Sequence, residues 1–441
     1  MGSMGYQVDS YQVTALRAME ILDSRGRPTL EVRVEVDGSA VGVAAVPSGA
    51  SKGTQEAAER RDGDPDRYRG AGVRTVVASI EQEIAAAIVG RRWASLEELD
   101  AALCALDGTA NKERLGANAI VGISMAAARG FARRDGVELY QWLPQLGGTA
   151  RLPVPHFNVV NGGVHAPNRL DFQEFMIAPL GAPSFSEALR AGAEIYLCLH
   201  DALARLGLAS GLGDEGGFAP ALQAPEDVLD LLVEAIAAAG YEPGPNGVAI
   251  ALDLAASEFR EADGRYHVNG SHFDSVDLVE YLAHLADRYP IWLIEDGVAE
   301  DDPKGWEILT QRLGERVQLV GDDNLVTNPE LISDAIAHRR GTAALIKVNQ
   351  VGTVTETLEA VRRCYRGHFG AMVSHRSGET ADTFIADLAV AIGCGQLKAG
   401  APARGERVAK YNRLLAIEAQ GTSLPYGVRP GRPGARDAGH G

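Results

Sequence analysis

The stretch from Val248 to Lys347 constrains the fold most, because its apolar runs end repeatedly in charged residues. The charged residues that end these runs are Asp253, Glu295-Asp296, Asp322-Asp323 and Lys347. Short apolar runs of this kind are typical of buried parallel strands. They recur at about the length of one strand–helix unit, roughly 30 residues. Because such strand ends meet on one face of a barrel, the stretch predicts a barrel with acids and a lysine at one end.

The acids at these strand ends form a candidate metal site. Carboxylate oxygens are the ligands that hard cations such as Mg²⁺ prefer, and Asp253, Glu295 and Asp322 supply them. A second interpretation is that each acid only caps the helix that follows it. For Lys347, burial and nearby cations would lower the pKa, as a catalytic base requires. A structural ion pair with one of the acids is the alternative, and both interpretations of Lys347 stay open.

Further polar residues follow the later apolar runs. Lys398 ends the run Gly395-Gln-Leu and has the same position in the pattern as Lys347. Arg376 stands beside Ser377, and a guanidinium can hold a phosphate or carboxylate by a two-pronged contact. The neighbouring His375 is more often a structural histidine than a catalytic one. These residues predict an anion-binding end of the barrel.

Composition excludes several classes of protein. The net charge of −17 argues against nucleic acid and anionic membranes as partners. A small anionic substrate is still compatible, because a bound cation can invert the local field. No apolar run approaches the roughly 18 residues of a membrane span, and no signal peptide opens the chain. The four cysteines lie far apart, which indicates reduced thiols and a cytoplasmic protein.

The order of patterns along the 441 residues predicts two domains. Alternating strands to about residue 46 precede helical patterns from about 73 to 137, which is typical of an α+β domain. We therefore expect an N-terminal α+β cap over 1–145, a barrel over 146–424 and a disordered tail over 425–441. The small-residue run from Pro47 to Thr54 is either a connector or a lid with Ser51 and Lys52 at its tip.

Long motifs throughout the chain carry a family resemblance. They are Ile21-Leu-Asp-Ser-Arg-Gly, Pro47-Ser-Gly-Ala-Ser, Asn161-Gly-Gly-Val-His-Ala, Gln173-Glu-Phe-Met, Gly213-Asp-Glu-Gly-Gly, Ala255-Ala-Ser-Glu-Phe, Ile294-Glu-Asp, Gly321-Asp-Asp, Lys347-Val-Asn-Gln, Ser374-His-Arg-Ser-Gly-Glu-Thr and Arg407-Val-Ala-Lys-Tyr-Asn. On these motifs the chain resembles the enolase (phosphopyruvate hydratase) family from about Ala18 to about Glu418. The resemblance implies an α/β fold, with an α+β cap followed by a TIM-like (β/α)8 barrel whose opening strands depart from strict alternation.

The resemblance also implies a role for each site residue. Two Mg²⁺ ions per active site are implied, the second arriving with substrate and approached by Ser51. The implied ligands of the tight Mg²⁺ are Asp253, Glu295 and Asp322. The implied base is Lys347, and the implied acid is Glu215 with Glu174 near it. The groups implied to hold substrate are His165, His375, Arg376, Ser377, Lys398 and Ser51. Sites of this superfamily are known to pair a lysine or histidine base with Mg²⁺.

The reaction that the resemblance implies is the reversible, Mg²⁺-dependent dehydration of 2-phosphoglycerate to phosphoenolpyruvate, by a homo-oligomer. Some positions depart from the family pattern: Lys52, Asn324, Ala381, Ala399 and Gly405. The added lysine and the lost acid raise the positive charge near the site, which would suit a substrate with an extra anionic group. An enolase paralogue acting on a phosphonate is therefore the alternative. A non-catalytic, surface-binding relative has less support, because no catalytic residue is lost.

Overall fold

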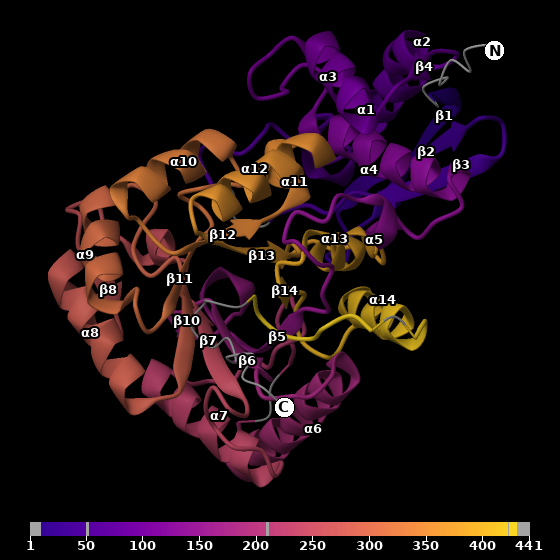
Figure 1. The fold of residues 1–441 in the computed structure, drawn as a ribbon. Helices are drawn as coiled ribbons and strands as arrows, with labels where there is room; N and C mark the ends of the chain where they lie inside the picture. Colours follow the sequence, from indigo (N-terminus) through magenta and orange to yellow (C-terminus); the bar gives the residue numbers. More distant parts are fainter. Residues whose placement is uncertain (1–9, 50–52, 209–210, 422, 430–441) are drawn as a thin grey trace. The chain divides into compact units, whose positions relative to one another are not determined.

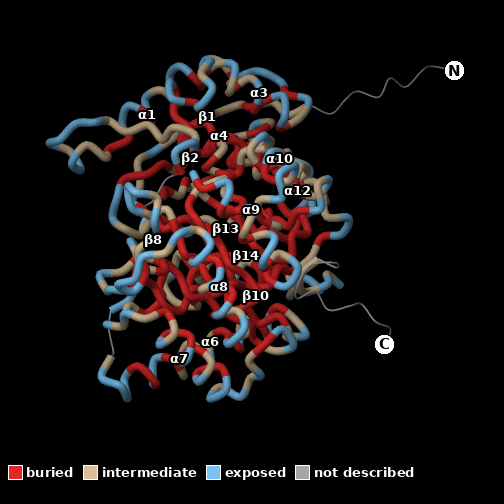
Figure 2. Tube along the Cα trace, turned by 90° about the vertical axis from the view of Figure 1, so that its left-hand side faces the viewer, coloured by how far each residue is buried: buried red, intermediate tan, exposed pale blue. Residues whose placement is uncertain are grey.

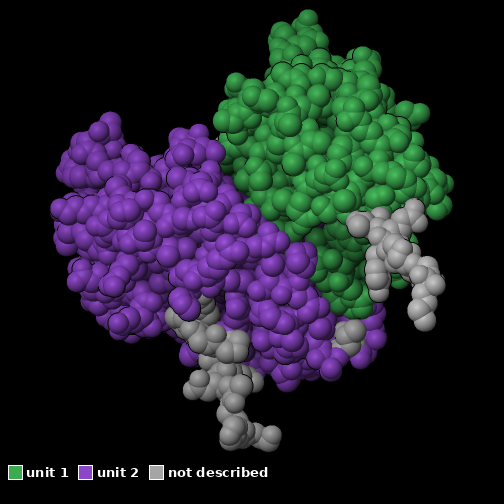
Figure 3. Space-filling model, turned by 45° about the horizontal axis from the view of Figure 1, so that its top comes forward, with its two compact units in different colours: residues 1–48, 56–143, 348–358 green, residues 49–55, 144–347, 359–441 purple. Residues whose placement is uncertain are grey.

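The structure is a computed structural model that describes residues 10–49, 53–208, 211–421 and 423–429. Ser51 and Lys52 lie outside the described residues. The chain divides into two compact units, coloured separately in Figure 3. Unit 1 comprises 1–48, 56–143 and 348–358, and unit 2 comprises 49–55, 144–347 and 359–441. The segment that directly follows Lys347 thus belongs to unit 1, which no sequence pattern indicated.

Unit 1 combines a four-stranded sheet with helices, as an α+β domain does. The sheet has the order β3-β2-β1-β4. Its strands are β1 (Tyr11–Leu22), β2 (Pro28–Val36), β3 (Ala40–Ala45) and β4 (Arg92–Trp93), and the helices are α1 (Arg74–Ser79), α2 (Ala85–Ile88), α3 (Leu96–Asp107), α4 (Ala117–Arg134) and α5 (Leu139–Trp142). Asp37 and Gly38 both have positive φ, which suits the tight turn that joins β2 to β3.

Helix α4 packs closely on β2 and β3 and forms the centre of this unit. A Cβ atom added to Gly42 would lie 1.8 Å from the Ala126 carbonyl oxygen, so only glycine permits the approach of strand and helix. Residues 348–358 also belong to this unit. They comprise α11 (Val348–Val351) and the first part of α12 (Val354–Arg366). There Val354 N donates to Ser124 Oγ at 3.0 Å, and Lys112 pairs with Glu356 at 2.8 Å.

Unit 2 is a closed eight-stranded barrel, visible in Figure 1. In barrel order its strands are β10 (Ile291–Glu295), β11 (Gln318–Gly321), β12 (Ala343–Ile346), β13 (Gly370–Ser374), β14 (Gln396–Lys398), β5 (Val154–Asn161), β6 (Glu174–Ala178) and β7 (Ala249–Asp253). β6 runs antiparallel to both neighbours, while the remaining pairs are parallel. The predicted TIM-like barrel with irregular opening strands is confirmed.

The helices of unit 2 follow the strands along the chain. They are α6 (Phe185–Arg205), α7 (Pro225–Ala238), α8 (Ser275–Arg288), α9 (Pro303–Leu313), α10 (Pro329–His338), the remainder of α12, α13 (Phe384–Ile392) and α14 (Gly405–Ala419), with a small hairpin of β8 (Tyr266–Val268) and β9 (Ser271–Phe273). The barrel strands are buried along their length, as Figure 2 shows for β10, β13 and β14. Burial on both faces explains their continuous apolar sequences. Among the described residues, no helix is both long and apolar enough to span a membrane.

Residues 425–429 do not form part of a disordered tail, contrary to our expectation. Leu152 N donates to the Pro425 carbonyl at 2.9 Å, and the Tyr426 hydroxyl donates to the Pro179 carbonyl at 2.8 Å. Tyr426 and Val428 also pack against the apolar core inside the barrel. These apolar side chains gain more from covering that core than from exposure to water. Residues 430–441 lie outside the described residues.

Candidate active site

Charged side chains gather at one end of the barrel. Asp253, Glu295 and Lys398 are the last residues of β7, β10 and β14. Asp322 and Lys347 directly follow β11 and β12. Because β6 is reversed, its first residue, Glu174, lies at the same end and stands opposite Asp253 in the β6–β7 register. The charged side chains predicted from the strand ends therefore do lie at one end of the barrel. Glu174 joins them from the start of a strand.

The three acids of the predicted metal site do not cap the helices that follow them. Asp274 accepts hydrogen bonds from the first turn of α8, Asp302 from that of α9, and Asn328 from that of α10. The capping interpretation of Asp253, Glu295 and Asp322 is therefore wrong, because other side chains already satisfy these helix ends. The burial of Asp253, Glu295 and Asp322 needs another explanation.

The converging side chains enclose a small polar pocket. It measures about 310 Å³ including its open mouth. Its lining consists of Gly49, His165, Gln173, Glu174, Glu215, Asp253, Asp322, Lys347, Ser374, His375, Arg376, Ser377 and Lys398. All the predicted site residues within the described part of the chain line it, except Glu295, which contacts the lining residue Lys398. A lining of this polarity suits a small charged molecule.

Lys398 lies among three buried carboxylates. Its Nζ atom is 2.8 Å from Asp253 Oδ2, 2.9 Å from Glu295 Oε2 and 3.1 Å from Glu174 Oε2. Burial alone would lower the pKa of Lys398, but these carboxylates outweigh burial and raise it well above its usual value. The ammonium is therefore permanently charged. We expected Lys398 to hold substrate, whereas in the structure its partners are protein carboxylates.

Lys347 forms an ion pair with Asp322. Burial favours the neutral amine, yet the Asp322 carboxylate outweighs burial, and the pKa of Lys347 is raised. The predicted lowering of this pKa is wrong for the side chains by themselves, because the nearest acid stabilises the ammonium. The ion-pair alternative describes the arrangement that the residues adopt here.

The acids around these lysines are suited to a cation. Burial raises the pKa of Glu295, and the neighbouring Asp253 and Asp322 carboxylates raise it further. Carboxylates that repel one another in a buried site gain stability when a divalent cation lies between them. Their oxygen-only donor set fits Mg²⁺. Two groups of described residues have ligand atoms that all lie within 4.8 Å of one another, and Asp253, Glu295 and Asp322 do not form either of them.

One such group contains Asp296, which our sequence reasoning did not include in the site. Asp296, Asp322 and Asp323 offer oxygen atoms within 4.8 Å of one another. The Asp296 carboxylate also accepts from the backbone N–H of Asp322 at 2.8 Å and of Asp323 at 3.0 Å. It thereby fixes the turn that presents Asp322 to the pocket. The adjacency of Glu295 and Asp296 at a strand end was the available signal.

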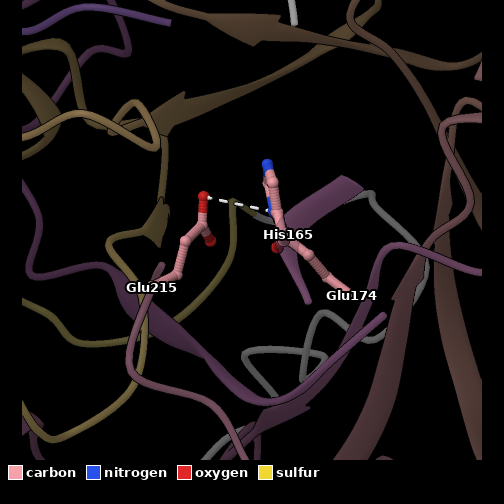
Figure 4. A group of neighbouring side chains, drawn as sticks. All are labelled: His165, Glu174 and Glu215. Atoms are coloured by element: carbon pink, nitrogen blue, oxygen red, sulfur yellow. Dashed lines mark ion pairs between the residues drawn. The ribbon is translucent and has the colours of Figure 1, made fainter. Parts of the chain in front are cut away.

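A second group lies near β5 and β6 and contains His165, Glu174 and Glu215 (Figure 4). His165 Nδ1 is 3.7 Å from an oxygen of each glutamate. Burial and the neighbouring Glu215 raise the pKa of Glu174 well above its usual value. Glu215 has a pKa well below its usual value: burial opposes ionisation, but His375 and His165 outweigh it. Burial and neighbouring charges thus push the two carboxyls toward opposite protonation states, which suits proton transfer better than Mg²⁺ binding.

Glu215 owes its position to two further side chains. Asn158 Nδ2 donates to Glu215 Oε2 at 3.0 Å, and His375 Nε2 lies 3.1 Å from the same oxygen. Asn158 lies on β5 and had no place in our predicted site. His375, which we regarded as more often structural than catalytic, is buried and directly touches a pocket carboxylate.

The comparisons with known proteins cover nearly the whole chain. Residues 13–143 match the family model described as the enolase N-terminal domain, and residues 149–427 match that of the enolase C-terminal TIM barrel domain. A curated protein named "Enolase" from Rubrobacter xylanophilus is 54% identical over 409 residues, which is 92% of this chain and 94% of that protein. The chain belongs to the enolase family. It is a carbon–oxygen lyase of the phosphopyruvate hydratase type.

Four of the positions at which the chain departs from the family pattern lie within the described residues. Ala399 is fully buried, Ala381 is exposed, and Gly405 begins α14 with open space around it. Asn324 follows Asp322-Asp323 and has its Oδ1 atom buried near Gly321. Within the described residues, none of the four lines the pocket. Lys52 lies outside the described residues.

Proposed function

We propose that this enolase catalyses the reversible dehydration of 2-phosphoglycerate to phosphoenolpyruvate with Mg²⁺. The observation that carries the proposal is the separation of a lysine from an acidic pair across one pocket. Lys347 follows β12 and Glu174 begins β6, and these two strands are four positions apart in the closed barrel of eight. They therefore stand on opposite sides of its mouth. A base on one side and an acid on the other are what an elimination across two carbons requires.

The proposed base is Lys347, which takes the proton from the carbon next to the substrate carboxylate. Lys347 can lose its own proton only when Asp322 has another partner, and a bound cation is such a partner. When bound, Mg²⁺ supplies positive charge that offsets the second negative charge on the substrate carboxylate. Asp253, Glu295 and Asp322 would hold the first ion. Ser51 would approach a second ion that arrives with substrate.

The proposed acid is the Glu174–Glu215 pair. The raised pKa of Glu174 favours its protonated form, while the lowered pKa of Glu215 favours the ionised form. The pair can therefore give a proton to the leaving hydroxyl and later take it back. Arg376, Ser377 and His165 line the pocket and would hold the phosphate and carboxylate of the substrate. We also propose that the enzyme is a cytoplasmic homo-oligomer. Sedimentation velocity would test the oligomeric state.

The experiment is the absorbance assay at 240 nm with 2-phosphoglycerate, after the metal is removed and Mg²⁺ is returned. We expect turnover in the ordinary range, above about 1 s⁻¹. We also expect a loss of activity on adding a chelator, and its recovery with Mg²⁺. Turnover below that range with saturating Mg²⁺ contradicts the proposed substrate.

The phosphonate substrate is the alternative that the sequence left open. Of the departures that suggested it, the four described ones lie outside the pocket wall, and only Lys52 remains. A competition assay between 2-phosphoglycerate and a phosphonate analogue therefore needs one variant, Lys52→Thr. A change in the preference between the two substrates supports a role of Lys52 in specificity. Equal preference in both proteins removes that role.

A further inference from the structure

Arg407 is a fully buried arginine that lies outside the catalytic set proposed above. It is near the start of α14, in the motif Arg407-Val-Ala-Lys-Tyr-Asn, and its exposed fraction is 0%. Its guanidinium donates to the Asp214 carbonyl at 3.0 Å, to the Arg376 carbonyl at 2.6 Å and to the Ser377 carbonyl at 2.7 Å. Arg407 thus joins the backbone beside Glu215 to the backbone of the predicted phosphate-binding residues.

The same guanidinium contacts an imidazole. Arg407 NH1 is 2.6 Å from His375 Nδ1. A guanidinium has only N–H donors, and it does not lose its charge in proteins. His375 Nδ1 must therefore be the acceptor, with its lone pair facing Arg407. A neutral imidazole that accepts at Nδ1 carries its proton on Nε2.

The Nε2 atom of His375 faces Glu215. It lies 3.1 Å from Glu215 Oε2, the oxygen that also accepts from Asn158, although at the ring orientation of the structure this approach is a close contact and not a completed hydrogen bond. We propose that Arg407 is a positioning residue, which fixes His375 in the tautomer with the proton on Nε2 and so directs that proton at the Glu215 carboxylate. For its catalytic consequence, this inference rests on the proposed function, because Glu215 belongs to the proposed acid pair.

The charges around His375 agree with this tautomer. Burial lowers the pKa of His375 to about 4; Glu215 and Glu379 oppose that shift, and Arg407 adds to it. The ring is therefore neutral near pH 7. A neutral ring suits both neighbours with one tautomer only, the acceptor nitrogen toward Arg407 and the donor nitrogen toward Glu215. Without Arg407 the Nδ1 atom would be open to protonation, and the ring could invert its roles.

The test is a measurement of the ring nitrogens by ¹H–¹⁵N correlation NMR on the full-length protein, labelled at histidine and free of substrate. A His375→Gln variant identifies the signals of His375 among the 10 histidines. We expect an unprotonated Nδ1 and a protonated Nε2 throughout pH 6 to 8. A proton on Nδ1 at pH 7, in either the other tautomer or an imidazolium, overturns the proposal without any need for an arginine variant.

Variants of Arg407 then test the cause. Arg407→Met removes every donor at similar length, so the midpoint for protonation of His375 should rise by about one pH unit or more. Arg407→Lys keeps a cationic donor and should restore the tautomer of the wild type. The matched control is Arg413→Gln on the same helix, whose arginine pairs with Asp387 and not with His375. An unchanged His375 spectrum in folded Arg407→Met overturns the proposal.

Activity gives a separate readout. With 2-phosphoglycerate and Mg²⁺, Arg407→Met should lower kcat by about 10²-fold with a smaller change in KM, because a displaced acid affects the transition state more than substrate binding. Arg407→Lys should recover part of that loss, and equal losses in both variants contradict the positioning role. If the wild type does not turn over 2-phosphoglycerate, the proposed function fails, whereas the NMR result on the tautomer stands independently.

Discussion

Glu174 stands directly opposite Asp253 across the antiparallel pair of β6 and β7, although Glu174 begins its strand and Asp253 ends its own. Lys398 Nζ lies close to both carboxylates, at 3.1 Å from Glu174 Oε2 and 2.8 Å from Asp253 Oδ2. Asp253, Glu295 and Asp322 lie at or just beyond the ends of parallel strands. The reversal of β6 adds Glu174 to them as a fourth acid. Lys398 carries one positive charge and Lys347 pairs with Asp322, so the four acids outnumber the two lysines among them and a further positive charge would stabilise this end of the barrel.

Replacement of Lys347 by alanine should abolish exchange of the substrate's alpha proton with solvent. The loss of a positioned base costs about 10²–10⁴-fold in rate. The measurement is deuterium incorporation into 2-phosphoglycerate, followed by NMR at saturating Mg²⁺. The control is Lys304→Ala, because Lys304 is an exposed lysine of α9. Persistent exchange in Lys347→Ala means that another residue is the base.

Removal of Mg²⁺ should lower the thermal stability of the wild type but not that of Glu295→Gln. A ligand that binds only the folded state at 100 times its Kd adds about 2.7 kcal/mol to the free energy of unfolding. Glu295→Gln removes a ligand from the proposed site and should abolish this increment. Asp227→Asn, at an exposed position of α7, is the control and should respond as the wild type does. An equal Mg²⁺ response in all three proteins places the metal elsewhere.

The free energy of unfolding should fall between about pH 4 and pH 6 because of Asp100. This buried acid of α3 accepts from Thr355 Oγ1 at 2.6 Å, and burial raises its pKa to about 6 from the usual 3.8. The folded state therefore binds the proton of Asp100 more tightly than the unfolded state does. The stabilisation that this proton provides is complete below about pH 4 and is lost as the pH rises through 6. The difference of about two pKa units corresponds to about 3 kcal/mol.

Asp100→Asn tests this account, because asparagine has the same shape and no charge in this pH range. Urea titrations at several pH values measure the free energy of unfolding of both proteins. The value for Asp100→Asn minus that for the wild type should increase as the pH rises from 4 to 7. Glu97→Gln, at an exposed position of the same helix, is the control. If the stabilities of Asp100→Asn and the wild type change in parallel with pH, the carboxyl of Asp100 does not titrate in this range.

Loss of the Tyr426 side chain should destabilise the barrel without changing its chemistry. Tyr426→Phe removes the hydrogen bond to the Pro179 carbonyl and should cost about 0.5–1.5 kcal/mol. Tyr426→Ala also removes apolar contacts with the barrel core and should cost more, about 2 kcal/mol. Urea unfolding measures both, and kcat should be unchanged in each variant. An unaltered stability of Tyr426→Ala would show that residues 425–429 contribute nothing to the fold.

Much of the fold could be predicted because buried strands have a simple pattern. The apolar runs that end at Asp253, Glu295 and Lys398 are strands of the barrel. Local patterns could not show that the segment after Lys347 is bound to unit 1, since its contacts with Ser124 and Asp100 join residues more than 200 positions apart. Tyr426 was missed for a similar reason: in a Pro- and Gly-rich sequence, only the shape of the barrel core indicates that an aromatic residue has a place to pack.

The candidate site divides in the same way. The chemical types of the side chains, and the strand ends that carry most of them, were determined by the sequence alone, because strand polarity brings those ends together. Only the tertiary structure decided the partners: Lys398 with three carboxylates, Lys347 with Asp322, and His375 between Arg407 and Glu215. The charge of each group depends on its burial and on neighbours from distant strands. A pKa is therefore a property of the folded arrangement, and no residue carries it in the sequence.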